Sequence, residues 1–313
     1  MRIVFIGAGE IGVPTLQAVL RSSEHQLTGV VTQPDKPVGR AQQIEPPPVK
    51  KALGSGAPGG RALPAAIPIL QPARIKDRQA IEEIRALQSD AIVVMAYGQI
   101  LPREVLEIPR LACLNLHASL LPRWRGATPI QAAIAAGDPE TGITVMYLAQ
   151  GLDTGDILLQ RKIDILPTDT GGSLHDRLAH IAPEALLEAL QMLAKSSAPR
   201  IPQDNAVATY APKLTRDNGK IDWSEPAEII ERKIRAFNPW PGAFTEIAAT
   251  GVRKLKIFSA AIIDLSGKPG EILRSEKELV IAADKGALSL GEVQLEGKRR
   301  MSAAEFVRGH ASH

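Results

Sequence analysis

Three polar residues in two short segments have side chains suited to chemistry at a carbonyl group. Asn115 and His117 lie in "LNLHASLLPRWRGATPIQ" (114–131), and Asp153 lies in "QGLDTGDI" (150–157). Alternate side chains of a strand share a face, so Asn115 and His117 are expected to point the same way. An amide can donate to a developing oxyanion, and a carboxylate can hold a nearby histidine in its proton-donating form. The set predicts addition of a substrate amine to a carbonyl carbon, without a hydroxyl or thiol nucleophile.

The alternative interpretation of His117 is a buried histidine whose hydrogen bonds are satisfied within the core. Two observations favour a site instead. Asn115 and His117 end an apolar run that is predicted as a buried strand, where polar groups are costly unless they are paired or used. Asp153 follows the next predicted strand, so all three side chains are expected at one rim of the sheet, where ligands bind.

Six short apolar runs are predicted as strands, and the stretches between them have helical spacing. The strands are 2–6, 27–32, 67–71, 91–97, 112–117 and 143–148. Helices are predicted at "VPTLQAVLRS", "RQAIEEIRALQ" and "TPIQAAIAAG". Several strands are continuous in Val, Ile and Leu, as expected when both faces are covered. The alternation predicts an α/β fold with a doubly wound, Rossmann-like parallel sheet.

The last third of the chain has a different pattern. A helix is predicted over 170–194, with a break or kink at Pro183. The stretch 195–208 is rich in Ser, Pro and other polar residues and is predicted as a linker. Brief alternating runs follow, which predict a smaller β-barrel domain of the OB-like kind. We therefore expect a catalytic domain at 1–194, the linker, and a second domain at 209–313.

A glycine motif follows the first predicted strand. Gly7, Gly9 and Gly12 have the G-x-G-x-x-G spacing of a dinucleotide-binding turn. Such a site also needs an acidic residue at the end of the second strand, where this chain has Thr32 and Gln33. We therefore expect the glycines to permit a tight turn and close packing, and we predict no NAD.

Composition restricts the possible partners and the compartment. The 313 residues include 37 Lys or Arg against 34 Asp or Glu, an excess too small to establish a nucleic-acid partner by itself. The single cysteine, Cys113, excludes an intrachain disulfide and fits a reducing compartment. No apolar stretch approaches the roughly 20 residues that span a bilayer. We expect a cytoplasmic protein without a membrane segment or a metal.

The segments "NLHASLLPRWRGATPIQ" and "GLDTGDI" together resemble the signature of the folate-dependent formyltransferase family. Members of this family transfer a formyl group from 10-formyltetrahydrofolate to an amine through an Asn–His–Asp set. The resemblance implies that Asn115, His117 and Asp153 are the catalytic residues. It also implies contacts to the folate co-substrate from two segments, "SLLP" and "AYGQILP": Ser119, Leu120, Leu121 and Pro122 in the first, Tyr97 and Ile100 in the second.

Several branches of the family share this set, including one that formylates UDP-amino sugars, which stays open as the alternative. "VVTQPDKPVGR", "TYAPKLTRDNGKIDWS" and "RAFNPWPGAF" are similar to the branch that formylates initiator methionyl-tRNA for translation initiation. That resemblance implies that the protein binds this tRNA and the folate donor. We expect a monomer. The resemblance also implies tRNA contacts from Arg40 and from the second domain, where we predict Lys298, Arg299 and Arg300; a solvated turn is the alternative for those three.

Two features depart from the pattern of that branch. Gln42 and Gln43 stand where paired lysines are common in a basic loop that approaches the acceptor stem, and fewer phosphate contacts should weaken tRNA binding. The stretch "GSGAPGGRALPAA" (54–66) is longer than usual and is expected to form a flexible surface loop.

Overall fold

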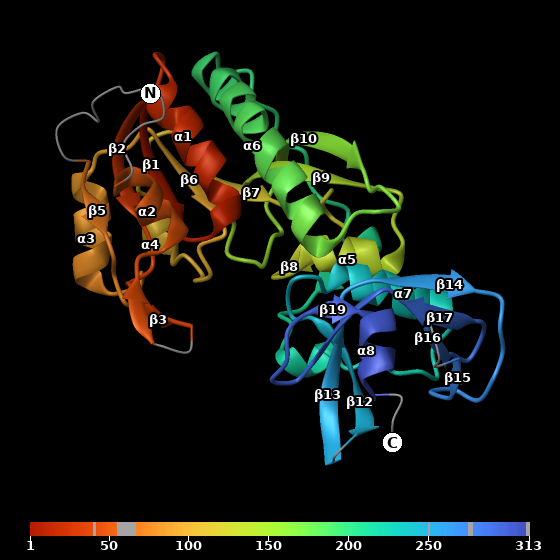
Figure 1. Ribbon diagram of the computed structural model, residues 1–313. Helices are drawn as coiled ribbons and strands as arrows, with labels where there is room; N and C mark the ends of the chain where they lie inside the picture. The colour runs from red at the N-terminus through yellow and green to blue at the C-terminus, as the bar shows by residue number, and fades with distance from the viewer. Residues whose placement is uncertain (40–41, 55–66, 250, 275–277, 311–313) are drawn as a thin grey trace. The chain divides into compact units, whose positions relative to one another are not determined.

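The computed structural model describes residues 1–39, 42–54, 67–249, 251–274 and 278–310 (Figure 1). Arg40 and nearly all of the predicted surface loop at 54–66 lie outside these residues. By contacts the chain forms two compact units. The first comprises Met1–Ala127, Thr141–Ile163 and His175–Tyr210, and the second comprises Thr128–Glu140, Asp164–Leu174 and Ala211–His313. The stretch 195–208 thus belongs to the first unit; the predicted domain boundaries stay a prediction.

The first unit is built on a seven-stranded sheet with the strand order β10-β9-β7-β6-β1-β2-β5. The strands are β1 (Arg2–Gly7), β2 (Gln26–Val31), β5 (Ile69–Leu70), β6 (Ala91–Met95), β7 (Ala112–His117), β9 (Glu140–Tyr147) and β10 (Ile157–Asp164). The order reverses between β1 and β6, as in a doubly wound sheet, and this part of the predicted fold is confirmed.

One strand runs in a direction that the sequence did not predict. The pairs β1–β2, β2–β5, β1–β6 and β6–β7 are parallel, but β9 is antiparallel to β7, with Leu114 opposite Tyr147 and His117 opposite Thr144. The sheet is therefore mostly parallel. The prediction was wrong here because a buried antiparallel strand has the same continuous apolar pattern as a parallel one.

Among the described residues, five helices and six short elements accompany this sheet. The helices are α1 (Val13–Arg21), α2 (Pro48–Gly54), α3 (Arg78–Ala86), α4 (Arg103–Leu106) and α6 (Gly171–Ala194). The 3-10 turns are η1 (Glu10–Gly12) and η2 (Asn205–Val207), and β3 (Lys36–Val38) pairs with β4 (Gln43–Glu45). The two-residue strands β8 (Arg125–Gly126) and β11 (Tyr210–Ala211) lie near the site described below.

Helix α6 is not broken at Pro183, contrary to one of the two predicted outcomes. An interior proline costs a helix about 3 kcal/mol. Leu178, Leu186 and Leu190 are all fully buried. Each buried leucine contributes about 1.5–3 kcal/mol. The apolar face on both sides of the proline therefore outweighs its cost.

The glycine turn between β1 and α1 packs closely against the end of β6. A Cβ atom on Gly7 would lie 2.6 Å from the Met95 carbonyl oxygen, and one on Gly9 would lie 3.1 Å from the Ala96 Cβ. The Gly9 N–H donates to the Ala96 carbonyl at 3.3 Å. Packing alone accounts for the absence of side chains at these positions.

The second unit contains two four-stranded sheets. One has the order β12-β13-β18-β19, and the other has the order β14-β17-β16-β15. Their bounds are Ala243–Ala249, Gly251–Ile257, Glu292–Leu295 and Met301–Ser302, then Ala260–Ile263, Ala287–Leu290, Leu279–Ala282 and Ile272–Arg274. The unit also holds α5 (Pro129–Ala136), η3 (Arg216–Gly219), α7 (Ala227–Ala236) and α8 (Ala303–His310).

Backbone hydrogen bonds join the two sheets of the second unit where β13 leads into β14 and β17 leads into β18. The Phe258 N–H donates to the Glu292 carbonyl and the Gly291 N–H donates to the Ser259 carbonyl, both at 2.9 Å. These bonds carry the β13–β18 pair into the β14–β17 pair, as at a barrel corner. One buried core fills the interior, with Leu255 and Leu288 from the two sheets and Phe306 from α8. The predicted second domain of antiparallel strands is confirmed.

Candidate active site

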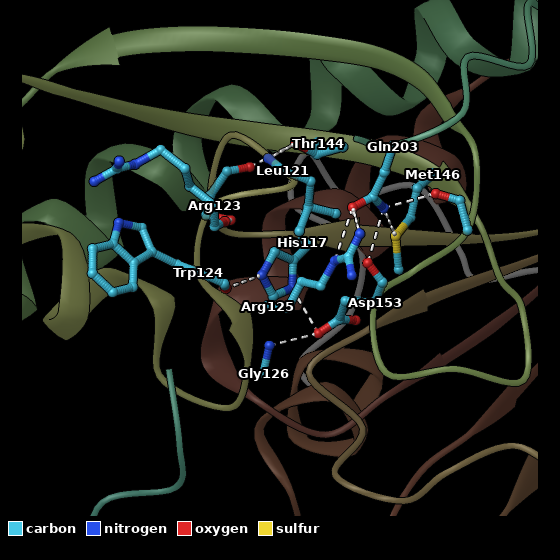
Figure 2. A network of polar contacts seen from close by, with 12 residues as sticks. His117, Leu121, Arg123, Trp124, Arg125, Gly126, Thr144, Met146, Asp153 and Gln203 are labelled. Carbon is cyan, nitrogen blue, oxygen red and sulfur yellow. Dashed lines mark hydrogen bonds and ion pairs between the residues drawn. The ribbon is translucent and has the colours of Figure 1, made fainter. Parts of the chain in front are cut away.

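His117, the last residue of β7, lies between two protein groups (Figure 2). Its Nε2 atom lies 2.8 Å from the Trp124 carbonyl oxygen. A carbonyl only accepts, so Nε2 carries a proton. The Nδ1 atom faces the Asp153 carboxylate with 3.6 Å between Nδ1 and Oδ2. The two side chains are only 6% and 13% exposed, so this pair is shielded from water.

Asp153 reaches His117 on a loop that doubles back. Because β9 is antiparallel to β7, the chain leaves β9 level with Cys113, whose carbonyl accepts from the Leu148 N–H. The loop must then return roughly 13 Å along the strand direction to His117. Asp153 has a left-handed backbone, with φ at 51°, and its Oδ2 accepts from the Gly126 N–H at 2.8 Å. Asp153 therefore lies close to His117, as predicted, although the prediction assumed that β9 runs parallel to β7.

Asn115 lies two residues before His117 on β7 and shares its face of the strand. Its side chain is partly exposed. Within the part of the chain that the structure describes, its amide makes no hydrogen bond to protein. The two amide N–H donors are therefore available to a ligand that enters beside His117.

Thr209 fixes the loop whose carbonyl holds His117. Trp124 has φ at 60°, and its N–H donates to the Thr209 hydroxyl at 2.8 Å. The Arg125 N–H donates to the Thr209 carbonyl at 2.9 Å, and the Thr209 N–H donates to the Pro122 carbonyl at 3.3 Å. The sequence analysis assigned no role to Thr209, because these partners are more than 80 residues away in the chain.

The buried Arg125 and the partly buried Gln203 form a polar network on the other side of the site. Arg125 is 2% exposed, and its guanidinium donates to the side-chain oxygens of Gln203 and Asn205. The Gln203 amide donates in turn to the carbonyls of Asp153 and Gly155. The sequence analysis missed this network as well, since a Gln and an Asn in a polar, Pro-rich stretch carry no sign of a contact with a residue about 80 positions earlier.

Hydrogen bonds within the protein fix the conformation of the "SLLP" segment. The Ser119 hydroxyl donates to a backbone carbonyl of the same loop at 2.7 Å, and the Ser119 carbonyl accepts from the Thr144 hydroxyl at 2.6 Å. Leu121 is buried and donates its N–H to the Thr144 hydroxyl. Leu120 and Pro122 stay partly exposed. Of the four residues, only these last two have side-chain surface to offer a ligand.

The two residues predicted from "AYGQILP" lie in opposite environments. Tyr97 is 2% exposed within a core cluster, and its hydroxyl has no partner among the described residues. Burial raises the pKa of this hydroxyl to about 12. Ile100 is 82% exposed. The structure does not bring these two side chains together on one surface.

The three residues of the second unit that we predict to contact tRNA, Lys298, Arg299 and Arg300, lie in the turn between β18 and β19. Arg299 pairs with Glu305 at 3.3 Å, and Arg300 pairs with Glu292 and lies over the Phe258 ring at 4.1 Å. Lys298 is exposed. Exposed ion pairs contribute only about 0–1 kcal/mol, so these cations can exchange their partners for phosphates at little cost.

Two general searches cover only the described residues. Among them, no three His, Cys, Asp or Glu side chains are grouped so that they could hold a metal ion. In the same part of the chain, every helix is too short or too polar to cross a membrane.

Comparisons with known proteins place this chain in a family. The family model "Formyl transferase" matches residues 1–190, and "Formyl transferase, C-terminal domain" matches residues 213–311. The methionyl-tRNA formyltransferase of Akkermansia muciniphila is 46% identical over 99% of this chain and 97% of its own.

Two solved structures are similar in fold. WlaRD, described as a sugar 3N-formyl transferase, has a TM-score of 0.66 at 19% identity, over 96% of this chain and 99% of its own. The methionyl-tRNA formyltransferase from Clostridium thermocellum has a TM-score of 0.59 at 18% identity, over 94% of this chain and 98% of its own. Such identities show the fold alone; with the family models and the close relative, they establish that this chain belongs to the formyl transferase family.

Proposed function

We propose that the protein transfers the formyl group of 10-formyltetrahydrofolate to the free amino group of initiator methionyl-tRNA, for translation initiation in the cytoplasm. The observation that carries the proposal is the arrangement of His117 between a carbonyl and a carboxylate, beside the unpaired amide of Asn115. The relative from Akkermansia muciniphila, similar over nearly the whole chain, supports the choice of acceptor.

The reaction forms a bond from the methionyl nitrogen to the formyl carbon and breaks the bond from that carbon to the folate nitrogen. The formyl oxygen carries negative charge in between. The Asn115 amide donates a hydrogen bond to this oxygen, and a protonated His117 supplies positive charge beside it. The proton that the amine loses ends on the folate nitrogen, so the charges balance.

Asp153 supports this chemistry in two ways. Its carboxylate stabilises the positive charge of His117 across 3.6 Å. We infer that it also takes up the amine proton and passes it on. Nε2 is bound to the Trp124 carbonyl, so Nδ1 is the ring nitrogen that faces this carboxylate.

The folate donor is a substrate, and Asn115, Leu120 and Pro122 are the residues we propose for its contacts at this rim. The same proposal assigns the tRNA acceptor stem to Arg40 and to the basic turn at 298–300. Phosphate contacts of this kind carry most of the affinity for a nucleic acid and little of the sequence preference.

The test is a formyl-transfer assay with labelled 10-formyltetrahydrofolate and two acceptors in separate reactions. We expect formyl-methionine on methionyl-tRNA and no product with a UDP-amino sugar. Formylation of the sugar alone would refute the proposed acceptor and keep the chemistry. Full activity of both His117→Ala and Asp153→Asn would refute the proposed site.

A further inference from the structure

The side-chain amide of Gln203 lies at the centre of this polar network, between Arg125 and the loop that carries Asp153 (Figure 2). Its Oε1 accepts from Arg125 Nε at 3.0 Å and from Nη2 at 2.8 Å. Its Nε2 donates to the Asp153 carbonyl at 2.9 Å and to the Gly155 carbonyl at 2.8 Å. Both ends of the amide are thus in use.

We propose that Gln203 is a positioning residue that sets the distance between Asp153 and His117. The inference rests on the proposed function, because it acts through the role assigned there to Asp153. Among the described residues, Gln203 makes no hydrogen bond to His117 or Asn115, so we assign it no direct part in the chemistry.

The orientation of the Gln203 amide has no alternative. A guanidinium can only donate, and a backbone carbonyl can only accept. If the amide were flipped, its NH₂ group would face the donors of Arg125, and its oxygen would face two carbonyls. The donors of Arg125 therefore fix the orientation of the Gln203 amide, with its N–H groups directed toward the Asp153 loop.

The loop needs such an anchor. It leaves β9 at the far end of β7 and returns to His117, and Asp153 sits in a left-handed conformation that L-residues rarely adopt. Such conformations persist only when the surroundings hold them. The Gln203 amide grips the backbone at residue 153 and two residues beyond, so it fixes the segment that orients the carboxylate.

Gln203→Glu separates positioning from folding. A glutamate keeps the oxygen that accepts from Arg125 and adds an ion pair to a buried cation, so the network around Arg125 survives. It lacks both N–H donors and sets a carboxylate against two carbonyl oxygens. The loop anchor is therefore lost while the fold is kept.

Asn205→Ala is the matched control. It removes the other amide oxygen bound to Arg125, at 2.9 Å from Nη2, and among the described residues Asn205 makes no hydrogen bond to the Asp153 loop. If support of Arg125 were all that Gln203 provides, Gln203→Glu would keep its activity, because it keeps that support, and Asn205→Ala would lose at least as much.

The experiment measures kcat and KM for methionyl-tRNA, and the melting temperature, in four variants: Gln203→Glu, Asn205→Ala, Asp153→Asn and the Gln203→Glu/Asp153→Asn double variant. For Gln203→Glu we expect a cooperative melting transition within a few degrees of the parent's, because the Arg125 ion pair offsets part of the repulsion between the carboxylate and the two carbonyls. We also expect a KM within about twofold and a kcat about 10- to 100-fold lower, as for a displaced supporting contact. Asn205→Ala should stay within about threefold in kcat.

The double variant tests whether Gln203 acts through Asp153. Two residues that act as one unit are not additive, so Gln203→Glu should cost little once Asp153 is already changed. An unchanged kcat in Gln203→Glu, an equal loss in Asn205→Ala, or full additivity in the double variant would overturn the inference. Full activity of Asp153→Asn would instead refute the proposed role of Asp153, so the two failures are distinguishable.

Discussion

Gly155→Ala is the perturbation whose consequence the structure defines most sharply. A Cβ atom at residue 155 would lie 1.7 Å from the Tyr147 carbonyl oxygen, and real Cβ atoms do not approach other atoms within 3.0 Å. The backbone at residue 155 must therefore move by more than 1 Å, because Tyr147 is fixed in β9 by its pairing with Leu114. Asp153 is two residues away on the same loop.

A shift of this size should affect both stability and catalysis. Forcing a group into a packed site costs typically about 1–3 kcal/mol. For a chain of this size each kcal/mol lowers the melting temperature by roughly 2–4 °C or less. A misplacement of about 1 Å in the catalytic geometry can lower the rate about 100-fold. We expect a fall in melting temperature of a few degrees with a fall in kcat of about 30- to 100-fold.

The assay is formyl transfer to methionyl-tRNA at a temperature well below the melting transition, so that loss of folded protein does not contribute. Gly54→Ala is the control, since a Cβ there would meet no atom within 4 Å. The reasoning is refuted if Gly155→Ala keeps a kcat within twofold of the parent. It is also refuted if Gly54→Ala loses as much activity as Gly155→Ala.

Three further outcomes follow from the contacts. Thr209→Val removes the hydroxyl that accepts from the Trp124 N–H, a bond worth about 1–3 kcal/mol when buried. We expect Thr209→Val to lower kcat and stability and Thr209→Ser to leave both unchanged. Equal kinetics in the two variants would contradict this. Replacing residues 298–300 with alanine should raise KM for methionyl-tRNA and reduce the slope of log K against log salt by about 3, with KM for the folate donor unchanged. Burial raises the pKa of the Cys113 thiol to about 12, so iodoacetamide at pH 8 should label it only after denaturation, and labelling of the folded protein would show the thiol accessible.

The central sheet could be predicted because its strands are apolar and its helices are amphipathic. Runs such as 2–6, 91–97 and 112–117 are mostly apolar, and each overlaps a strand of the sheet. Burial on both faces imposes this pattern regardless of neighbouring strand direction. For the same reason the antiparallel course of β9 could not be seen in the sequence, since residues 143–147 would look the same in either direction.

The residues of the candidate site fall into two groups: those whose proximity follows from a short sequence spacing, and those whose partners are far away in the sequence. Asn115 and His117 share one strand face, so their proximity follows from a two-residue spacing. Gln203 and Thr209 act on residues about 50 and 85 positions earlier in the chain, through a loop and a carbonyl. No local pattern reports a contact at that separation, and "IPQDNAVAT" has the composition of a solvated linker.

The polar groups around His117 therefore have two different tasks. Thr209 holds the Trp124 backbone, which orients one face of the imidazole, and Gln203 holds the Asp153 loop, which faces the other. Both anchors come from one short stretch, 203–209, so a displacement of that stretch would move the carbonyl and the carboxylate together. Such coupling keeps the imidazole oriented beside the Asn115 amide, which has no partner among the described residues and which the proposed function assigns to the substrate. The stretch predicted as a linker is thus the element on which the preorganisation of the site depends.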